Sequence, residues 1–167
     1  GSPFYLSTGN WCGGEAGREP KAASDGSNFL LVAPCGEANS YKLQALRLTP
    51  TGTVMGGAAV DVDPGRTAEN VSVAFDGTNY FLVWDTTGTP KNIYGRFLSP
   101  DGSLVGSEVE ISAGTYDSRN PSVAFGGGKY LVVWADGNRL SGPVYDIKGA
   151  TVATGGKVGP AFFISQG

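Results

Sequence analysis

The chain has 167 residues, of which 27 are glycine and ten are proline, and its net charge is −3. The negative charge argues against a nucleic-acid partner, because binding phosphates requires clustered Lys and Arg. No apolar run approaches the roughly 18 residues of a membrane-spanning helix. Because the chain has no histidine, it has no Ser-His-Asp or Cys-His arrangement and no His-bearing metal site.

The first twenty residues are expected to form one lone strand and a loop. Residues 3–7 (PFYLS) resemble the fourth strand of a unit whose first three strands are missing. A start at Gly1 rather than Met is expected of a processed or partial chain. The two cysteines, Cys12 and Cys35, are predicted to form a disulfide, which indicates an oxidising compartment and a secreted or cell-surface protein. Two unpaired thiols are the alternative.

Residues 21–69 are predicted to be the first of three all-β units. The segment KAASDGSNFLLVA at 21–33 predicts two short strands joined by a tight Asp-Gly turn. Where the later units end the second strand with tryptophan, this unit has Ala33-Pro34-Cys35. The proline is expected to end the strand, and the missing indole is expected to leave a space that Trp11 partly fills.

Residues 70–119 are the second unit and residues 120–167 the third. NVSVAFDGTNYFLVW at 70–84 predicts strands at 72–75 and 80–84, and IYGRFLSPDGSLVG at 93–106 predicts a strand at 93–98 followed by a tight turn. The third unit repeats the first of these segments about fifty residues later, as NPSVAFGGGKYLVVW at 120–134. It closes on an apolar strand at 162–165. The three units are expected to form a single repeat domain.

This pattern resembles the β-propeller-type repeats of bacterial secreted and surface proteins. In outline those units read Val-Ala-Phe, a glycine turn, Tyr-Leu-Val-Val-Trp, Ile-Tyr-Gly and an Asp-Gly turn, and the likeness is close over residues 70–136. It implies an all-β, β-propeller-like fold of three four-stranded antiparallel blades plus an extra N-terminal strand. Such folds serve mainly in binding and scaffolding and sometimes in catalysis, so the resemblance implies architecture rather than activity.

A propeller places its tight hairpins on one face and its longer, variable loops on the other, where binding residues usually lie. Trp84 and Trp134 are predicted to be core residues, because the aromatics that a repeat shares pack between its units. For Asp85 and Asp136, hydrogen bonds to turn amides compete with a ligand-binding role. The candidate ligand-binding residues are Trp11, Tyr116, Asn92, Arg119, Asp85 and Asp136.

Asp61 and Asp63, with Glu69 nearby, have the alternating carboxylates of a calcium loop. A further acidic position is missing and the pattern occurs in one unit only, so turn chemistry explains it better. No cofactor is therefore expected, and calcium at these three residues is the alternative.

The function predicted from these observations is a non-catalytic extracellular module that binds a carbohydrate or a protein partner at a cell surface. One alternative is a structural subunit that self-associates by pairing its edge strands. The other is a polysaccharide hydrolase that uses a pair of carboxylates. The distance between carboxylates cannot be read from a sequence, and no catalytic residue is assigned.

Overall fold

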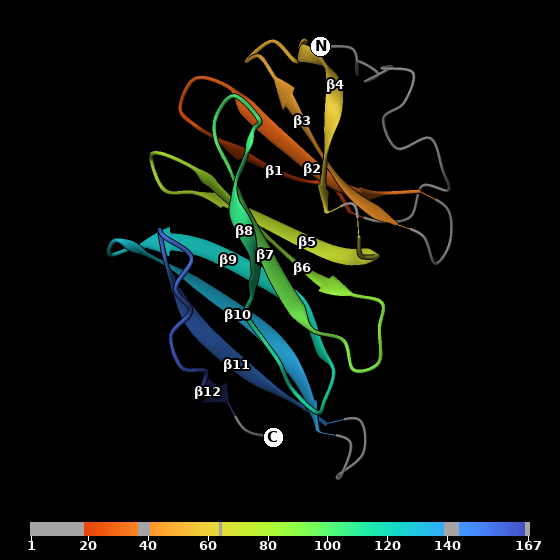
Figure 1. Cartoon of the computed structure of the whole chain (residues 1–167). Helices are drawn as coiled ribbons and strands as arrows, with labels where there is room; N and C mark the ends of the chain where they lie inside the picture. Colours follow the sequence, from red (N-terminus) through yellow and green to blue (C-terminus); the bar gives the residue numbers. More distant parts are fainter. Residues whose placement is uncertain (1–18, 37–40, 64, 139–143, 166–167) are drawn as a thin grey trace.

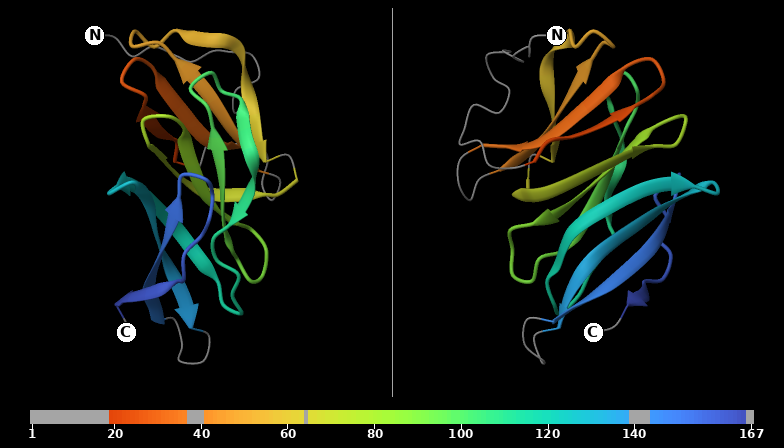
Figure 2. Two further views of the ribbon diagram at one scale, coloured as in Figure 1. Left: turned by 60° about the vertical axis from the view of Figure 1, so that its left-hand side comes forward. Right: turned by 180° about the vertical axis from the view of Figure 1, so that it is seen from behind.

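The fold consists of three antiparallel β-sheets that follow one another along the chain. A computed structural model describes residues 19–36, 41–63, 65–138 and 144–165. Each sheet is a meander of four strands in sequence order, and Figures 1 and 2 show the sheets as successive layers. The prediction of three four-stranded antiparallel blades is confirmed. The lone strand predicted at residues 3–7 lies outside the described residues.

The first sheet contains β1 (Lys21–Ser24), β2 (Phe29–Cys35), β3 (Lys42–Leu48) and β4 (Val54–Asp63). The second contains β5 (Ala68–Phe75), β6 (Tyr80–Thr86), β7 (Ile93–Leu98) and β8 (Leu104–Glu110). The third contains β9 (Ser118–Gly126), β10 (Lys129–Asn138), β11 (Val144–Ala153) and β12 (Phe162–Ser165).

Three of the tight hairpins, β1–β2, β5–β6 and β7–β8, have an aspartate followed by a glycine in the turn. In the β5–β6 turn, Asp76 Oδ1 accepts hydrogen bonds from the backbone N–H groups of Thr78 and Asn79, both at 2.7 Å. Gly77, which directly follows Asp76, has a φ of 95°, a conformation that residues with a side chain rarely adopt. The β1–β2 turn repeats this arrangement around Asp25. These turns fix the register of each strand pair and confirm the predicted hairpins.

Two hydrophobic cores lie between the sheets, and the second sheet contributes to both. Along β6, the side chains of Tyr80, Leu82 and Trp84 pack against the first sheet. The alternate residues Phe81 and Val83 pack against the third sheet. A strand with both faces covered has a continuous apolar sequence, as β6 does. Trp84 and Trp134 are both buried in these cores, which confirms their predicted packing role.

The first strand of each sheet lies beside the first strand of the next. β5 is in contact with both β1 and β9, and the backbone N–H of Val123 donates to Ser72 Oγ at 3.2 Å. β1, β5 and β9 are therefore the inner strands of three successive blades. No helix in the described part of the chain is long and apolar enough to cross a membrane.

Three sequence-based boundaries differ from the structure. β5 begins at Ala68 and β9 at Ser118, each two residues before the expected start of its unit. Pro34 does not end β2, which pairs with β3 as far as Cys35. β1 pairs with β2 only up to Val32, so beyond that residue none of the described strands lies on this side of β2. A proline is tolerated there because it removes no hydrogen bond from a ladder.

Candidate functional site

A cavity opens at the N-terminal ends of the three inner strands. Its volume is about 310 Å³, and it lies where β1, β5 and β9 begin. It is lined by Glu19, Lys21, Asn70, Val71, Asn120 and Pro121. This position, at the strand ends of adjacent blades, is a common place for ligand sites in propellers and barrels.

Three of the lining residues occupy the same position in the repeat. Asn70 and Asn120 stand at the same place in the matching segments that begin the second and third units. Aligning the Asp25 turn with the Asp76 turn places Glu19 at that position in the first unit. Each unit therefore has a polar residue at this position, and only the first unit has a carboxylate there.

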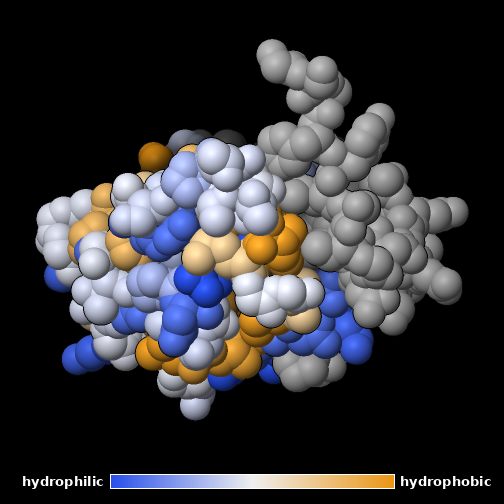
Figure 3. Space-filling model, turned by 90° about the horizontal axis from the view of Figure 1, so that it is seen from above, coloured by the Kyte–Doolittle hydropathy of each residue, from blue (hydrophilic) through white to orange (hydrophobic). Residues whose placement is uncertain are grey.

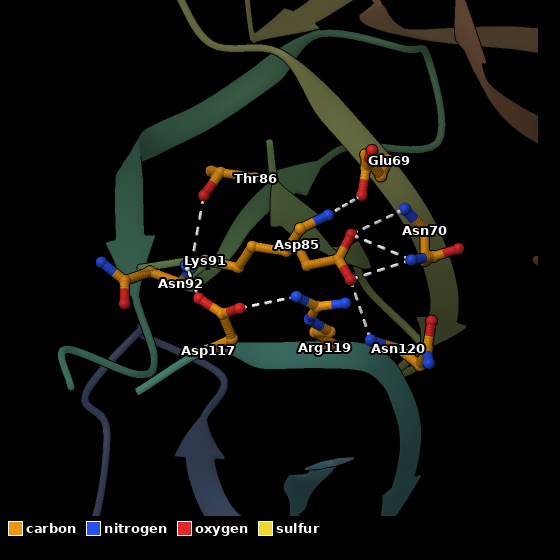
Figure 4. Close-up of polar contacts among 9 residues, drawn as sticks. All are labelled: Glu69, Asn70, Asp85, Thr86, Lys91, Asn92, Asp117, Arg119 and Asn120. Carbon is orange, nitrogen blue, oxygen red and sulfur yellow. Dashed lines mark hydrogen bonds and ion pairs between the residues drawn. The ribbon is translucent and has the colours of Figure 1, made fainter. Parts of the chain in front are cut away.

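Asp85 fixes two of these three positions. Its buried carboxylate accepts hydrogen bonds from the Asn70 backbone N–H at 2.8 Å and from Asn70 Nδ2 at 2.9 and 3.2 Å. It also accepts the backbone N–H of Asn120 at 2.9 Å, which joins the second blade to the third (Figure 4). Several donors satisfy the charge, which offsets the cost of burying this carboxylate.

Asn120 adopts a backbone conformation that is unusual for a residue with a side chain. Its φ is 53°, in the left-handed region, where Asn is tolerated better than most residues. The bond from its N–H to Asp85 helps to hold this conformation. Its side chain is exposed and lines the cavity. Strained backbone of this kind is concentrated at binding and catalytic sites.

Glu19 differs from its two counterparts because its unit has no equivalent of Asp85. Pro34 stands at that position in the first unit. The Glu19 carboxylate is exposed and pairs with Lys21 Nζ at 2.7 Å. The hydrogen bond and the charge of Lys21 hold the pKa of Glu19 below its ordinary value of 4.5. The cavity therefore contains an ionised carboxylate at neutral pH.

A second polar network lies beside Asp85 and ties the β6–β7 loop to the start of β9. Asp117 Oδ1 accepts the backbone N–H of Lys91 at 3.0 Å, and Asp117 Oδ2 accepts from Arg119 at 2.6 Å. The Lys91 ammonium pairs with Glu69, and both side chains are largely buried. Figure 4 shows these residues gathered between the second and third blades. These residues bond to one another across the junction, which indicates a structural role.

The structure brings together some of the residues proposed from the sequence, but not in the cavity. Asp85, Arg119 and Asn92 lie in the polar networks of Figure 4. Asn92 closes its own loop, since its N–H donates to Thr86 Oγ1 at 3.2 Å. Tyr116 is half-buried and lies elsewhere, and Asp136 forms an ion pair with Lys148 Nζ at 3.1 Å. Trp11 lies outside the described residues.

The predicted calcium ligands make separate contacts. Asp61 accepts a hydrogen bond from Gln44 Nε2 at 2.9 Å, Asp63 accepts the backbone N–H of Gly65 at 3.0 Å, and Glu69 pairs with Lys91. Among the described residues, no group of three metal-binding side chains is present. These contacts give the calcium prediction no support.

Cys35 is buried at the end of β2 and is not a free thiol. Its predicted partner, Cys12, lies outside the described residues, so the Cys12–Cys35 disulfide stays a prediction. The same holds for the predicted filling of the first unit by Trp11.

Sequence reasoning missed Glu19, Asn70 and Asn120, although a signal was present. The residues predicted to form a site are mostly ones that break the repeat or lie in long loops. The cavity instead uses one repeat position at which the residue type changes from Glu to Asn. Comparing the three units column by column at the starts of the inner strands would have found it.

No protein-family model matches the chain, and no curated protein matches it. Solved structures of similar fold include an endo-arabinase from Bacteroides thetaiotaomicron, with a TM-score of 0.62 and 16% identity over 88% of this chain and 60% of that one. A thermostable family-43 glycoside hydrolase has a TM-score of 0.59 and 18% identity, over 89% of this chain and 54% of that one. An α-L-arabinofuranosidase from Lactobacillus brevis has a TM-score of 0.60 and 12% identity, over 89% of this chain and 53% of that one. The β-propeller-like fold is thereby shown, and the chain spans little more than half the length of these enzymes.

These comparisons correct the prediction of a non-catalytic binding module. Several of the similar structures are glycoside hydrolases, which favours the hydrolase alternative over the main prediction. The prediction placed the carboxylate-pair hydrolase second because the distance between carboxylates cannot be read from a sequence. At 12–18% identity the likeness itself shows the fold alone.

Proposed function

We propose that this chain forms part of a glycoside hydrolase that acts on an arabinose-containing polysaccharide, with its site in the cavity at the ends of β1, β5 and β9. The observation that carries the proposal is the ionised Glu19 carboxylate, which shares this cavity with two asparagines at equivalent positions. Support for the substrate class comes from the arabinan-degrading enzymes among the structures of similar fold.

The chemistry assigned to Glu19 follows from its charge. A carboxylate that stays ionised at neutral pH acts as a general base on water, or as a nucleophile, at the anomeric carbon. The lowered pKa favours these roles over that of the general acid, which requires a raised pKa. The side chain of Asn120 supplies amide groups that would bind sugar hydroxyls, and the Asp85 network holds its backbone in place.

The reaction also requires a second carboxyl group to protonate the leaving oxygen. Among the described residues that line the cavity, Glu19 is the one acidic side chain. The proposal therefore requires that the general acid come from outside this set of lining residues.

Reducing-end release from arabinan tests the proposal. The wild-type chain is expected to release arabinose-containing fragments, and Glu19→Gln is expected to lower the rate at least about a hundredfold. The matched control is Asp101→Asn, a carboxylate in the β7–β8 turn, where asparagine can still accept the bond from the Ser103 N–H. The control variant is expected to keep the wild-type rate.

Two outcomes would contradict the proposal. One is a wild-type chain that releases nothing from arabinan or from a panel of related polysaccharides. The other is a Glu19→Gln variant as active as the control.

A further inference from the structure

The side chain of Asn70 is held in one orientation by Asp85. Asn70 Nδ2 donates to Asp85 Oδ2 at 2.9 Å and to Asp85 Oδ1 at 3.2 Å, and the backbone N–H of Asn70 donates to the same carboxylate at 2.8 Å. A carboxylate has acceptor atoms only, so the NH₂ group of the amide has to face it. The amide oxygen of Asn70, Oδ1, therefore lies on the side away from Asp85, as Figure 4 shows.

This oxygen is the part of the Asn70 amide that is left for a ligand. Asn70 lines the cavity, and no described residue donates a hydrogen bond to its Oδ1. The amide cannot turn over to offer its NH₂ group without losing both side-chain bonds to Asp85. Toward the cavity, Asn70 is therefore a hydrogen-bond acceptor and not a donor.

Asn120 occupies the same repeat position but is not restricted in this way. Asp85 binds its backbone N–H only, and the third unit has Ala135 where the second unit has Asp85. Among the described residues, none forms a hydrogen bond with the Asn120 amide. This exposed side chain can turn either its oxygen or its NH₂ group toward a ligand. The cavity thus contains one fixed amide and one adaptable amide.

The first unit adds a second acceptor. The Glu19 carboxylate also lines the cavity, and it accepts a hydrogen bond from Lys21 Nζ at 2.7 Å. A ligand group that lies against Asn70 Oδ1 must supply a hydrogen. A sugar hydroxyl has one, whereas an ether, an ester or a carboxylate has none.

The cavity suits a small polar ligand. Its volume of about 310 Å³ is at the lower end of the range for small-molecule sites, about 300–1,000 Å³. Figure 3 looks down on the end of the molecule that carries the first sheet, where the described surface mixes hydrophobic and polar residues. Broad apolar patches are typical of protein-binding surfaces. The mixed surface and the small volume together favour recognition by a few directed hydrogen bonds.

We propose that Asn70 determines the specificity of the cavity by accepting a hydrogen bond from one sugar hydroxyl, so that sugars in which this hydroxyl is absent, etherified or esterified are excluded. The inference rests on the proposed function, because it takes the ligand to be a sugar. It adds the chemical feature that the arabinose-containing substrate must keep. Asp85 positions Asn70 for this role without touching the ligand.

The selectivity has a physical cause. A sugar without the hydroxyl would cover Asn70 Oδ1 and separate it from solvent without giving it a hydrogen. A site that is built to bind a hydroxyl rejects the analogue without it, because the polar atom of the site is left unpaired. The loss of affinity is expected to be at least about tenfold.

Binding rather than hydrolysis tests the inference. The titrations are made on Glu19→Gln, which keeps the shape of the side chain and slows cleavage of the ligand, and binding is followed by NMR. The ligands are arabinobiose and analogues in which one hydroxyl at a time is replaced by fluorine, which is close to a hydroxyl in size but cannot donate. One analogue is expected to bind at least about tenfold more weakly than arabinobiose.

Two substitutions at equivalent positions, made in the same background, assign this effect to a residue. Asn70→Ala is expected to bind arabinobiose and that analogue equally, because the acceptor is gone. Asn120→Ala is the matched control, and it is expected to bind both ligands more weakly while keeping the difference between them. If circular dichroism shows that Asn70→Ala does not fold, Asn70→Ser takes its place, since a serine hydroxyl can still donate to Asp85.

The outcomes separate the inference from the proposed function. The inference is overturned if every analogue binds like arabinobiose, if Asn70→Ala keeps the difference, or if Asn120→Ala removes it. In each of these cases, release of fragments from arabinan by the wild type would still support the proposed function. Failure of arabinobiose to bind, together with no release from arabinan, would overturn both.

Discussion

The first and second blades have the same plan but use the same repeat positions differently. In the second blade, Trp84 fills the core and Asp85 fixes Asn70 and the start of the next blade. In the first blade those positions are Ala33 and Pro34, and Glu19 replaces the asparagine. The comparison shows that one repeat position holds an internally bonded asparagine in one copy and an exposed carboxylate in another, where the internal partner is lost.

The largest expected effect comes from making the second blade resemble the first at its core. Trp84→Ala removes a fully buried indole and leaves a cavity between the first two sheets. The free energy of unfolding is expected to fall by about 3–5 kcal/mol, measured by urea denaturation. A loss below about 1 kcal/mol would mean that the second blade tolerates alanine as the first does, and the contrast between the blades would fail.

The next largest effect is expected at the carboxylate that the first blade lacks. Asp85→Asn removes the charge that accepts bonds from Asn70 and Asn120, and it sets an NH₂ group against these donors. The unfolding free energy is expected to fall by about 2–3 kcal/mol. The same change at Asp61, whose pair with Lys42 is exposed, is expected to cost less than about 1 kcal/mol. Equal costs at the two sites would contradict the anchoring role of Asp85.

A smaller effect is expected where a tyrosine reaches back to the preceding blade. The Tyr130 hydroxyl donates to the backbone oxygen of Asn79 at 3.1 Å, whereas Phe29 has no hydroxyl at this position. Tyr130→Phe is expected to cost about 1 kcal/mol in urea denaturation. Tyr145→Phe, at an exposed tyrosine, is the control and is expected to change nothing measurable.

The smallest effect on stability is expected at Glu19. Because its pKa is lowered by Lys21, its pairing contributes to stability at pH values above the ordinary pKa of 4.5, and the contribution is lost as the pH falls further. Both groups are exposed, so Glu19→Gln is expected to leave the unfolding free energy unchanged within error at pH 7 and at pH 3. A clear loss of stability at pH 7 would assign Glu19 a structural role and remove its contrast with Asn70.

Much of the fold was predictable because the repeat places apolar alternation and turn residues in register. The strand at Ile93–Leu98 has the predicted bounds, and the Asp76 turn is where its sequence indicates. The early start of β5 at Ala68 was not predictable, because the residues before Asn70 lack strand alternation and are held by a neighbouring blade. The backbone N–H of Ala68 donates to the oxygen of Tyr41 at 3.0 Å.

The candidate site was less predictable, for a physical reason. Asp85 and Arg119 are polar residues near variable loops, which is what a binding site looks like in sequence. In the fold Asp85 accepts the backbone N–H of Asn120 across a blade junction, and Arg119 donates to Asp117 within its own blade. Only the three-dimensional arrangement shows that these bonds are internal. The convergence of Glu19, Asn70 and Asn120 likewise depends on the stacking of three sheets.

The sharing of the second sheet between both cores has a consequence for how the chain gains and loses its structure. An end sheet can detach while one core remains intact, but the middle sheet cannot leave without opening both. Local unfolding should therefore begin at the ends, and the amide protons of β6 should exchange most slowly with solvent. Cooperativity in this protein is set by its central blade, and any association that covers the end sheets would extend it to the whole chain.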